Sequence, residues 1–283
     1  NVPATGTTYS YVPHVYKAIL ARVNYNYLKK YLFEINMGYN GSNRFAKGHQ
    51  YQVFPASSIG WVITEEPWMK PAKKVINFAK VRASYGIVGN DNLGSFAYYY
   101  LSSYNGGKSY SFGDTWNAKT TGLVEGKPAN ENISWEVSRK FDVGFDTKWF
   151  DNHFTFSGDY FYEHRTDILN TPANFTLVSG LTAMSPDNIG IIDNEGFEFE
   201  AGYDNRIGDF RYYIKGNAGY AHNTIIENGE ADQPYDYMYS KGHSIGQYTG
   251  YHHIGFFQSY EEIAASPTQF GLTNLLPGDS KYA

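Results

Sequence analysis

The chain has 283 residues, a formal net charge of −5 at pH 7 and no cysteine. This length fits one large all-β unit or two ordinary domains. The lack of thiols excludes disulfides and thiolate metal sites, and the acidic balance argues against nucleic acid as the main partner. Aromatic residues make up 18% of the chain, with 27 tyrosines, and this composition favours strands.

No apolar run approaches the ~18 residues that a membrane-spanning helix needs, so the composition excludes a helical membrane protein. A barrel strand needs only every second residue to be apolar, so a transmembrane β-barrel stays open. The first residues do not form a signal peptide, and the last ones, Pro277-Gly278-Asp279 onward, are turn-like. We interpret both ends as internal and expect a fragment of a longer protein.

Residues 31–40 alternate strictly, with Phe33 and Ile35 on one side and Glu34 and Asn36 on the other. Successive side chains of a strand point to opposite faces, so this segment has one apolar and one polar face. Aromatic residues stand at the ends of the apolar face. The pattern is typical of a strand with lipid outside and water inside.

The same alternation recurs along the chain. In order, it predicts eight antiparallel strands at residues 16–27, 31–40, 52–64, 76–89, 134–149, 154–167, 196–204 and 210–222. Tight turns alternate with longer stretches at 41–51, 90–133, 168–195 and from 223 onward. The link at 65–75 has room for one helical turn. Short turns on one side and long loops on the other are typical of outer-membrane barrels, whose short turns face the periplasm.

The alternation also assigns side chains to the two faces. We expect lipid contacts from Phe33, Ile35, Met37, Phe141, Val143, Phe145, Tyr212 and Ile214. We expect lumen positions for Arg22, Lys80, Arg82, Lys140, Asp142, Lys148, Arg211 and Lys215. A register slip of one residue would exchange the two faces, so these assignments are a sharp prediction.

Six short motifs follow one another along the chain, at residues 40–45, 54–61, 80–90, 132–146, 188–198 and 250–279. Examples are Asn40-Gly41-Ser42-Asn43-Arg44-Phe45 and Lys80-Val81-Arg82-Ala83-Ser84-Tyr85-Gly86. In this order they resemble the SusC/RagA family of TonB-dependent outer-membrane transporters of Bacteroidota. The resemblance implies a barrel of about 22 strands. Residues 1–283 would then be part of one barrel domain, with the plug domain and the remaining strands absent.

The resemblance also implies partners and a function. The partners would be a SusD-like surface lipoprotein, outer-membrane lipid, and TonB–ExbB–ExbD acting through the missing plug. The protein would be a multi-pass barrel of the outer membrane that imports a nutrient. An oligosaccharide is the first candidate for this nutrient and a peptide is the second. The barrel wall would be a scaffold for this transport.

Two other classes compete with this interpretation. A secreted or surface-anchored β-sandwich that binds glycans or forms a surface layer would also alternate polar and apolar residues, but its apolar faces must cover each other. For an enzyme, the sequence offers neither a nucleophile elbow nor a phosphate loop. We expect no catalytic residue, no cofactor and no metal site. Glu261 and Glu262 are expected to cap a short helix after Ser259.

Two groups of aromatic residues are candidates for binding. In the long stretch at 90–131 we expect ligand contacts from Tyr98, Tyr99, Tyr100 and Trp116. The alternative is that these rings only form a small core or pack on the lipoprotein. After residue 222 we expect an outward loop in which Tyr248, Tyr251 and Phe257 contact the lipoprotein. The alternative there is an extra hairpin around 246–258.

Overall fold

The computed structural model describes residues 13–94, 98–112, 118–173, 184–269, 271 and 274–282. Its contacts divide the chain into two compact units, Asn1–Ile245 and Gly246–Ala283, and each is described by itself. No helix in the described ranges is long and apolar enough to cross a membrane.

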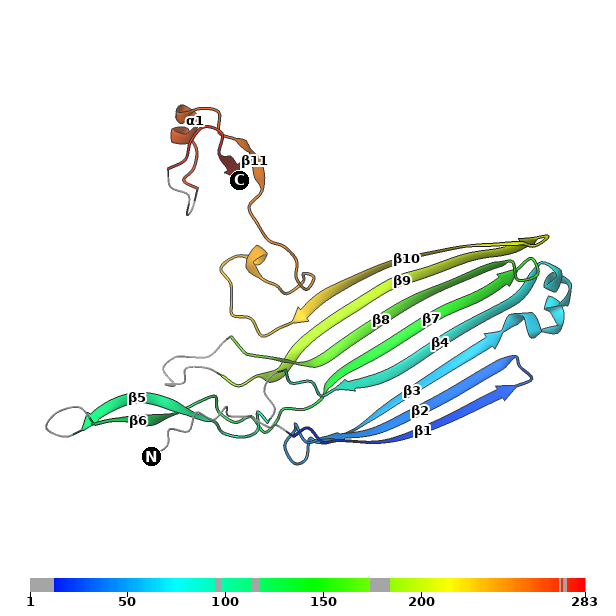
Figure 1. The fold of residues 1–283 in the computed structure, drawn as a ribbon, viewed down its shortest axis with the longest axis horizontal. Coiled ribbons are helices and arrows are strands. Elements are labelled where there is room, and N and C mark those ends of the chain that lie inside the picture. Colours follow the sequence, from blue (N-terminus) through cyan, green and yellow to red (C-terminus); the bar gives the residue numbers. More distant parts are fainter. Residues whose placement is uncertain are drawn as a thin grey trace. The chain divides into compact units, whose positions relative to one another are not determined.

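The first unit is built on one antiparallel sheet of eight strands, drawn side by side in Figure 1. The strands are β1 (Tyr16–Tyr27), β2 (Tyr31–Ser42), β3 (Tyr51–Val62), β4 (Ile76–Asn90), β7 (Glu136–Trp149), β8 (Phe154–Asn170), β9 (Asp187–Ile207) and β10 (Phe210–Glu227). Their order in the sheet is their order in the chain, with β1 and β10 at the two edges. The expected eight-stranded antiparallel wall is therefore confirmed, as an open sheet.

The connections alternate as the sequence predicted. Turns after β1, β7 and β9 are short, and the link from β3 to β4 at the same end carries the 3₁₀ helices η1 (Ile63–Glu65) and η2 (Pro67–Lys74). At the other end, the link from β4 to β7 contains a separate hairpin of β5 (Tyr104–Phe112) and β6 (Ala118–Glu125). The chain after β10 includes η4 (Asp236–Met238). The hairpin was not expected.

Three of the strands are clearly longer than expected. β8 runs to Asn170 instead of 167, and β10 runs to Glu227 instead of 222. β9 runs from Asp187 to Ile207, whereas the sequence predicted 196–204. In this stretch Ile191 and Ile192 are adjacent, so the alternation that marks a membrane strand is lost. A bilayer crossing takes about 9–11 tilted residues. β9 has 21 and β10 has 18 residues, so both continue beyond the membrane, where water contacts both faces.

The register places one apolar row across all eight strands. Neighbouring partners in this row are Tyr25, Phe33, Ile59, Ala83, Val143, Tyr160, Phe197 and Tyr220. Their side chains share one face, and apolar residues there are exposed, up to 70% for Ile214. The division of these residues between two faces is confirmed, because the paired residues keep the predicted parity in every strand, and the contact of the apolar face with lipid stays a prediction.

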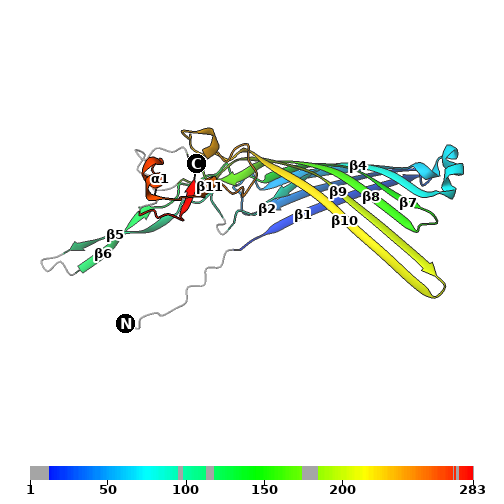
Figure 2. The same ribbon diagram turned by 90° about the horizontal axis from the view of Figure 1, so that it is seen from above.

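A single sheet also decides against the sandwich. In the described residues the only other sheets are the two-stranded pairs β5–β6 and β11–β12, which cannot cover an eight-stranded face. Apolar side chains that stay exposed over a whole sheet need lipid rather than a second layer. Figure 2 shows the twist of the sheet, with β9 and β10 diverging from β1 and β2. The surface-layer alternative is therefore wrong.

A small core lies at the long-loop end of the sheet. It is made of five buried side chains, Phe45, Phe54, Leu93, Ile133 and Trp135. Trp135 is tied down by its indole nitrogen Nε1, which donates to the carbonyl oxygen of Gln50 at 3.2 Å. Phe54 lies on β3, Phe45 lies in the link from β2 to β3, and the other three lie in the link from β4 to β7. The core therefore fixes these two links to each other and to the sheet.

The second unit contains β11 (His253–Phe256), the helix α1 (Tyr260–Ala265) and β12 (Ser280–Tyr282). β11 pairs with β12, so the alternative of an extra hairpin around 246–258 is wrong. α1 begins as predicted after Ser259, whose side chain accepts a hydrogen bond from the Glu262 backbone N–H at 3.2 Å. This Ser cap and the acidic first turn are what the short helix needs at its N-terminus.

Replacing Val143 by arginine tests the lipid-facing assignment. Val143 lies near the middle of β7 on the apolar face, so a charge there should cost about 2–4 kcal/mol of unfolding free energy. Asn217→Arg on the polar face of β10 is the matched control and should cost far less. The measurement is denaturant unfolding of the full-length protein in lipid vesicles. Equal costs for the two variants would contradict the assignment.

Candidate functional site on the polar face

A charged cluster centred on Arg82 lies on the polar face of the sheet. Its guanidinium donates from Nη2 to Asp159 Oδ2 at 2.7 Å and from Nη1 to Asp142 Oδ1 at 3.1 Å. Nε donates to Asp146 Oδ2 at 3.3 Å. One cation therefore joins three carboxylates on β7 and β8. All four side chains are between 20% and 36% exposed, so water screens the cluster only in part.

The absence of a side chain at Gly144 makes the contact between Arg82 and Asp159 possible. In the register, Arg82 of β4 pairs with Gly144 of β7, which pairs with Asp159 of β8. Arg82 thus crosses over β7 to reach Asp159. A Cβ at Gly144 would lie 2.0 Å from Asp159 Oδ1 and 3.0 Å from Arg82 Cζ. The glycine keeps open the path of the ion pair.

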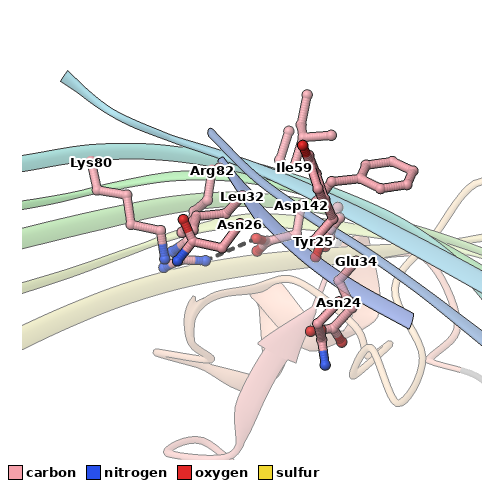
Figure 3. Close-up of a pocket in the computed structure, with 14 residues that line it drawn as sticks. Asn24, Tyr25, Asn26, Leu32, Glu34, Ile59, Lys80, Arg82 and Asp142 are labelled. Atoms are coloured by element: carbon pink, nitrogen blue, oxygen red, sulfur yellow. Dashed lines mark hydrogen bonds and ion pairs between the residues drawn. The ribbon is translucent and has the colours of Figure 1, made fainter. Parts of the chain in front are cut away.

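Arg82 and Asp142 of the cluster line a hollow of about 490 Å³ on the polar face. Figure 3 shows Lys80, Arg82 and Asp142 on the same side of the strands, with the Arg82–Asp142 contact dashed. Asn24 and Glu34 line the hollow from β1 and β2. The hollow offers ammonium, guanidinium, amide and carboxylate groups, which suit hydrogen bonding to a polar surface.

A second hollow of about 420 Å³ continues the polar face over β8, β9 and β10. It is acidic, with Asp159, Glu198 and Glu200 in its lining, and Lys215 Nζ lies 2.8 Å from Glu200 Oε1. Opposite charges therefore alternate along the wall. In the part of the chain that the structure describes, no group of three His, Asp or Glu residues is placed to hold a metal ion.

The predicted ligand-binding tyrosines lie at the long-loop end. Tyr98 and Tyr100 pack edge to face, with ring centroids 5.8 Å apart, and both hydroxyls contact Asn43. Tyr99 packs against the buried core, and this burial raises the pKa of its hydroxyl. Trp116 lies outside the described residues. These contacts give the tyrosines a structural role, and ligand contact by them stays a prediction.

The predicted lipoprotein anchors fall in the second unit and differ from one another. Tyr248 is 100% exposed, and Tyr251 is largely exposed although its ring centroid lies 6.0 Å from that of Tyr282. Phe257 is 1% exposed, with the Lys281 ammonium 5.7 Å from its ring centroid. Its ring belongs to the interior of this unit and offers no contact surface.

The loop expected after β10 is also present. Residues 228–245 leave the sheet at the long-loop end, where the Lys241 ammonium lies 2.9 Å from Glu227 Oε2. The Gly242 backbone N–H donates back to the Ile225 carbonyl at 2.8 Å. This first part of the segment therefore begins as a loop on the side that the strand order predicted.

A second polar cluster, the Glu66 node, consists of the Glu66 carboxylate and its hydrogen-bond donors. The sequence did not predict it. This carboxylate is 8% exposed, yet it accepts hydrogen bonds from Tyr31 Oη at 2.8 Å and Trp61 Nε1 at 3.1 Å. Lys30 Nζ donates to it at 3.2 Å. These donors, the Tyr31 hydroxyl foremost, hold the pKa of the Glu66 carboxyl below its usual value and outweigh the opposing effect of burial. The node pins the short-turn end of β1, β2 and β3.

Comparison with known proteins agrees with this geometry. Residues 2–274 match the family described as "TonB dependent receptor-like, beta-barrel". A TonB-dependent receptor of Formosa agariphila is 31% identical over 278 residues, covering 96% of this chain and 25% of that protein. The TonB-dependent receptor SusC of Bacteroides thetaiotaomicron is 31% identical over 229 residues, covering 80% of this chain and 22% of that protein.

A solved structure of the RagAB peptide transporter superposes with a TM-score of 0.64 at 20% identity, covering 76% of this chain and 22% of that one. The fold, with lipid on one face and ion pairs on the other, is that of an outer-membrane barrel wall. The chain belongs to the TonB-dependent receptor-like β-barrel family, and it resembles SusC in sequence. It spans about a quarter of the length of the curated relatives it matches.

Gly144→Ala tests the geometry of the Arg82 cluster. The added methyl group displaces Asp159 from Arg82, so we expect a loss of about 1–3 kcal/mol of unfolding free energy. Gly216→Ala on β10 is the control, because a Cβ there meets nothing within 4 Å. The control should be neutral or slightly stabilising. Denaturant unfolding of the full-length protein measures both, and equal stability of the two variants would refute the role of Gly144.

Glu66→Gln tests the second node through its pH dependence. The folded-state pKa lies below the reference value of 4.5, so ionised Glu66 stabilises the fold above pH 4.5. That contribution is lost as pH falls through the folded-state pKa. We therefore expect the variant to melt below the wild type at neutral pH and the two melting curves to converge in acid.

Thermal unfolding of the full-length protein in detergent, followed by circular dichroism, measures this difference. Glu65→Gln is the matched control, because Glu65 and Lys73 are 42% and 38% exposed, so water screens their ion pair and it contributes little. If the difference in melting temperature between Glu66→Gln and the wild type stayed constant down to acid pH, the ionised Glu66 carboxylate would not be the source of the stabilisation.

Proposed function

We propose that the full protein imports a nutrient through the outer membrane, and that this chain supplies part of the wall of its barrel. The observation that carries the proposal is the single sheet with an apolar row across eight strands and ion pairs on its other face. Such a wall separates lipid from an aqueous interior. Energy would come from TonB–ExbB–ExbD pulling on a plug, so the wall itself needs no catalytic residue.

The partner on the outside would be a SusD-like surface lipoprotein. Support comes from the sequence similarity to SusC and from the fold shared with RagAB, whose structure is known in an "open-open" and a "closed-closed" state. In this chain the exposed rings of Tyr248 and Tyr251 are suited to such a contact. Aromatic anchors of this kind are enriched at protein interfaces.

The substrate would be an oligosaccharide. The polar face offers carboxylate, amide and ammonium groups, which can hydrogen-bond to sugar hydroxyls. The partly exposed rings of Tyr98 and Tyr100 could stack on sugar rings at the long-loop end. A peptide is the second candidate, favoured by the fold shared with the RagAB peptide transporter.

Growth of the source bacterium tests this function. A strain that lacks the full-length gene should fail to grow on one class of oligosaccharide but grow on the corresponding monosaccharide. Returning the intact gene should restore growth, and the protein should be extracted from the membrane only with detergent. Loss of growth on peptides alone would select the second candidate. Unchanged growth and uptake on both classes would refute import of either nutrient.

A further inference from the structure

The link between β3 and β4 is unlike the other connections at its end of the sheet. The turns after β1, β7 and β9 leave two to four residues between strands, whereas residues 63–75 insert two 3₁₀ helices. This end is the one with the short turns, and in an outer-membrane barrel it faces the periplasm. A tight turn would be enough to connect β3 and β4, so the connection alone does not explain the inserted residues.

The link is held rigidly against the sheet. Thr64 is fully buried, and its hydroxyl oxygen accepts from the Ala79 backbone N–H at 3.3 Å. Glu66 is fixed by its three donors. On the far side, the Val75 carbonyl accepts from the Phe150 N–H at 2.9 Å, and Asn77 Nδ2 donates to the Lys73 carbonyl at 3.2 Å. Both flanks are therefore bonded to β-strands or turns, and η2 is a preformed platform.

The outer surface of this platform combines aromatic and basic side chains. Trp68 is 62% exposed, and Val75 and Phe150 are also exposed. Exposure of an indole ring to water is unfavourable, so an exposed tryptophan on a rigid element indicates that another surface covers it. Phe150 follows Trp149, which pairs with Ile76 on the lipid-facing side of the sheet. The exposed apolar surface is thus continuous along the chain with the membrane-facing wall.

The charge of the platform is positive because its acidic residues are already neutralised. Glu66 bonds to Lys30, and Glu65 lies 3.0 Å from Lys73. Lys70 and Lys74 form no ion pair within the described part of the chain, and both are exposed. Asp151 in the turn after β7 is exposed and forms no ion pair within the described part of the chain, so it does not neutralise either lysine. Two ammonium groups therefore remain beside an exposed indole.

We propose that residues 67–75 dock on anionic phospholipid headgroups of the periplasmic leaflet. Trp68 would sit at the headgroup level, where an indole can keep its ring in apolar surroundings and its N–H in water. Lys70 and Lys74 would contact phosphate, and each lysine near an anionic surface contributes about fivefold in affinity, which corresponds to about 1 kcal/mol. The link then anchors the barrel rim to the bilayer, independently of what the barrel transports.

Fluorescence quenching tests this docking. The full-length protein is placed in phosphatidylcholine vesicles that contain brominated phosphatidylglycerol or, at equal fraction, brominated phosphatidylcholine. The Trp68 signal is the tryptophan fluorescence of the wild type minus that of the Trp68→Phe variant. We expect the brominated phosphatidylglycerol to quench this signal severalfold more strongly. The preference should shrink as salt is added and disappear in Lys70→Gln/Lys74→Gln.

Lys108→Gln/Lys119→Gln on the β5–β6 hairpin is the matched control and should keep the preference, because those lysines lie on a separate sheet. Equal quenching by both lipids in the wild type would overturn the role of anionic headgroups. A Trp68 signal that neither lipid quenches would overturn membrane docking altogether and leave a periplasmic protein as the occupant. A preference that survives both lysine substitutions and high salt would overturn the assignment to Lys70 and Lys74.

Discussion

The backbone of a membrane strand has no water to bond to, and the rest of this structure depends on that constraint. Every amide in the bilayer must pair with a neighbouring strand, so the eight long strands form one antiparallel sheet in sequence order. Alternation then gives each strand one lipid face and one polar face. The row from Tyr25 to Tyr220 shows that the register keeps these faces aligned over eight strands.

The second constraint is electrostatic: charged side chains that lie against the low-dielectric sheet must be paired. Arg82 is shared by Asp142, Asp146 and Asp159, and Gly144 leaves the space through which the farthest pair meets. Glu66 is satisfied in the same way by three donors from neighbouring elements. In both nodes one charged group joins several strands, so the polar contacts hold the wall together where apolar packing is not available.

The eight membrane strands could be found from the sequence, because alternation such as Phe33-Glu34-Ile35-Asn36 is a local property. The early start of β9 could not, since Ile191-Ile192 lies beyond the membrane, where neither face has to be apolar. The β5–β6 hairpin lacks alternation for the same reason. Gly144 and Glu66 were missed because their roles depend on partners far along the chain. A glycine flanked by charged positions in a membrane strand is the signal that could have pointed to Gly144.

The most direct test of the account is the environment of adjacent residues on one strand. Spin labels on Val143→Cys and Asp142→Cys, and on Phe199→Cys and Glu200→Cys, are compared in the full-length protein in vesicles. The account predicts that dissolved oxygen relaxes the labels at 143 and 199 more, and a water-soluble nickel complex those at 142 and 200. The same accessibility at neighbouring positions, or the reverse order, would contradict a wall with lipid on one face and water on the other.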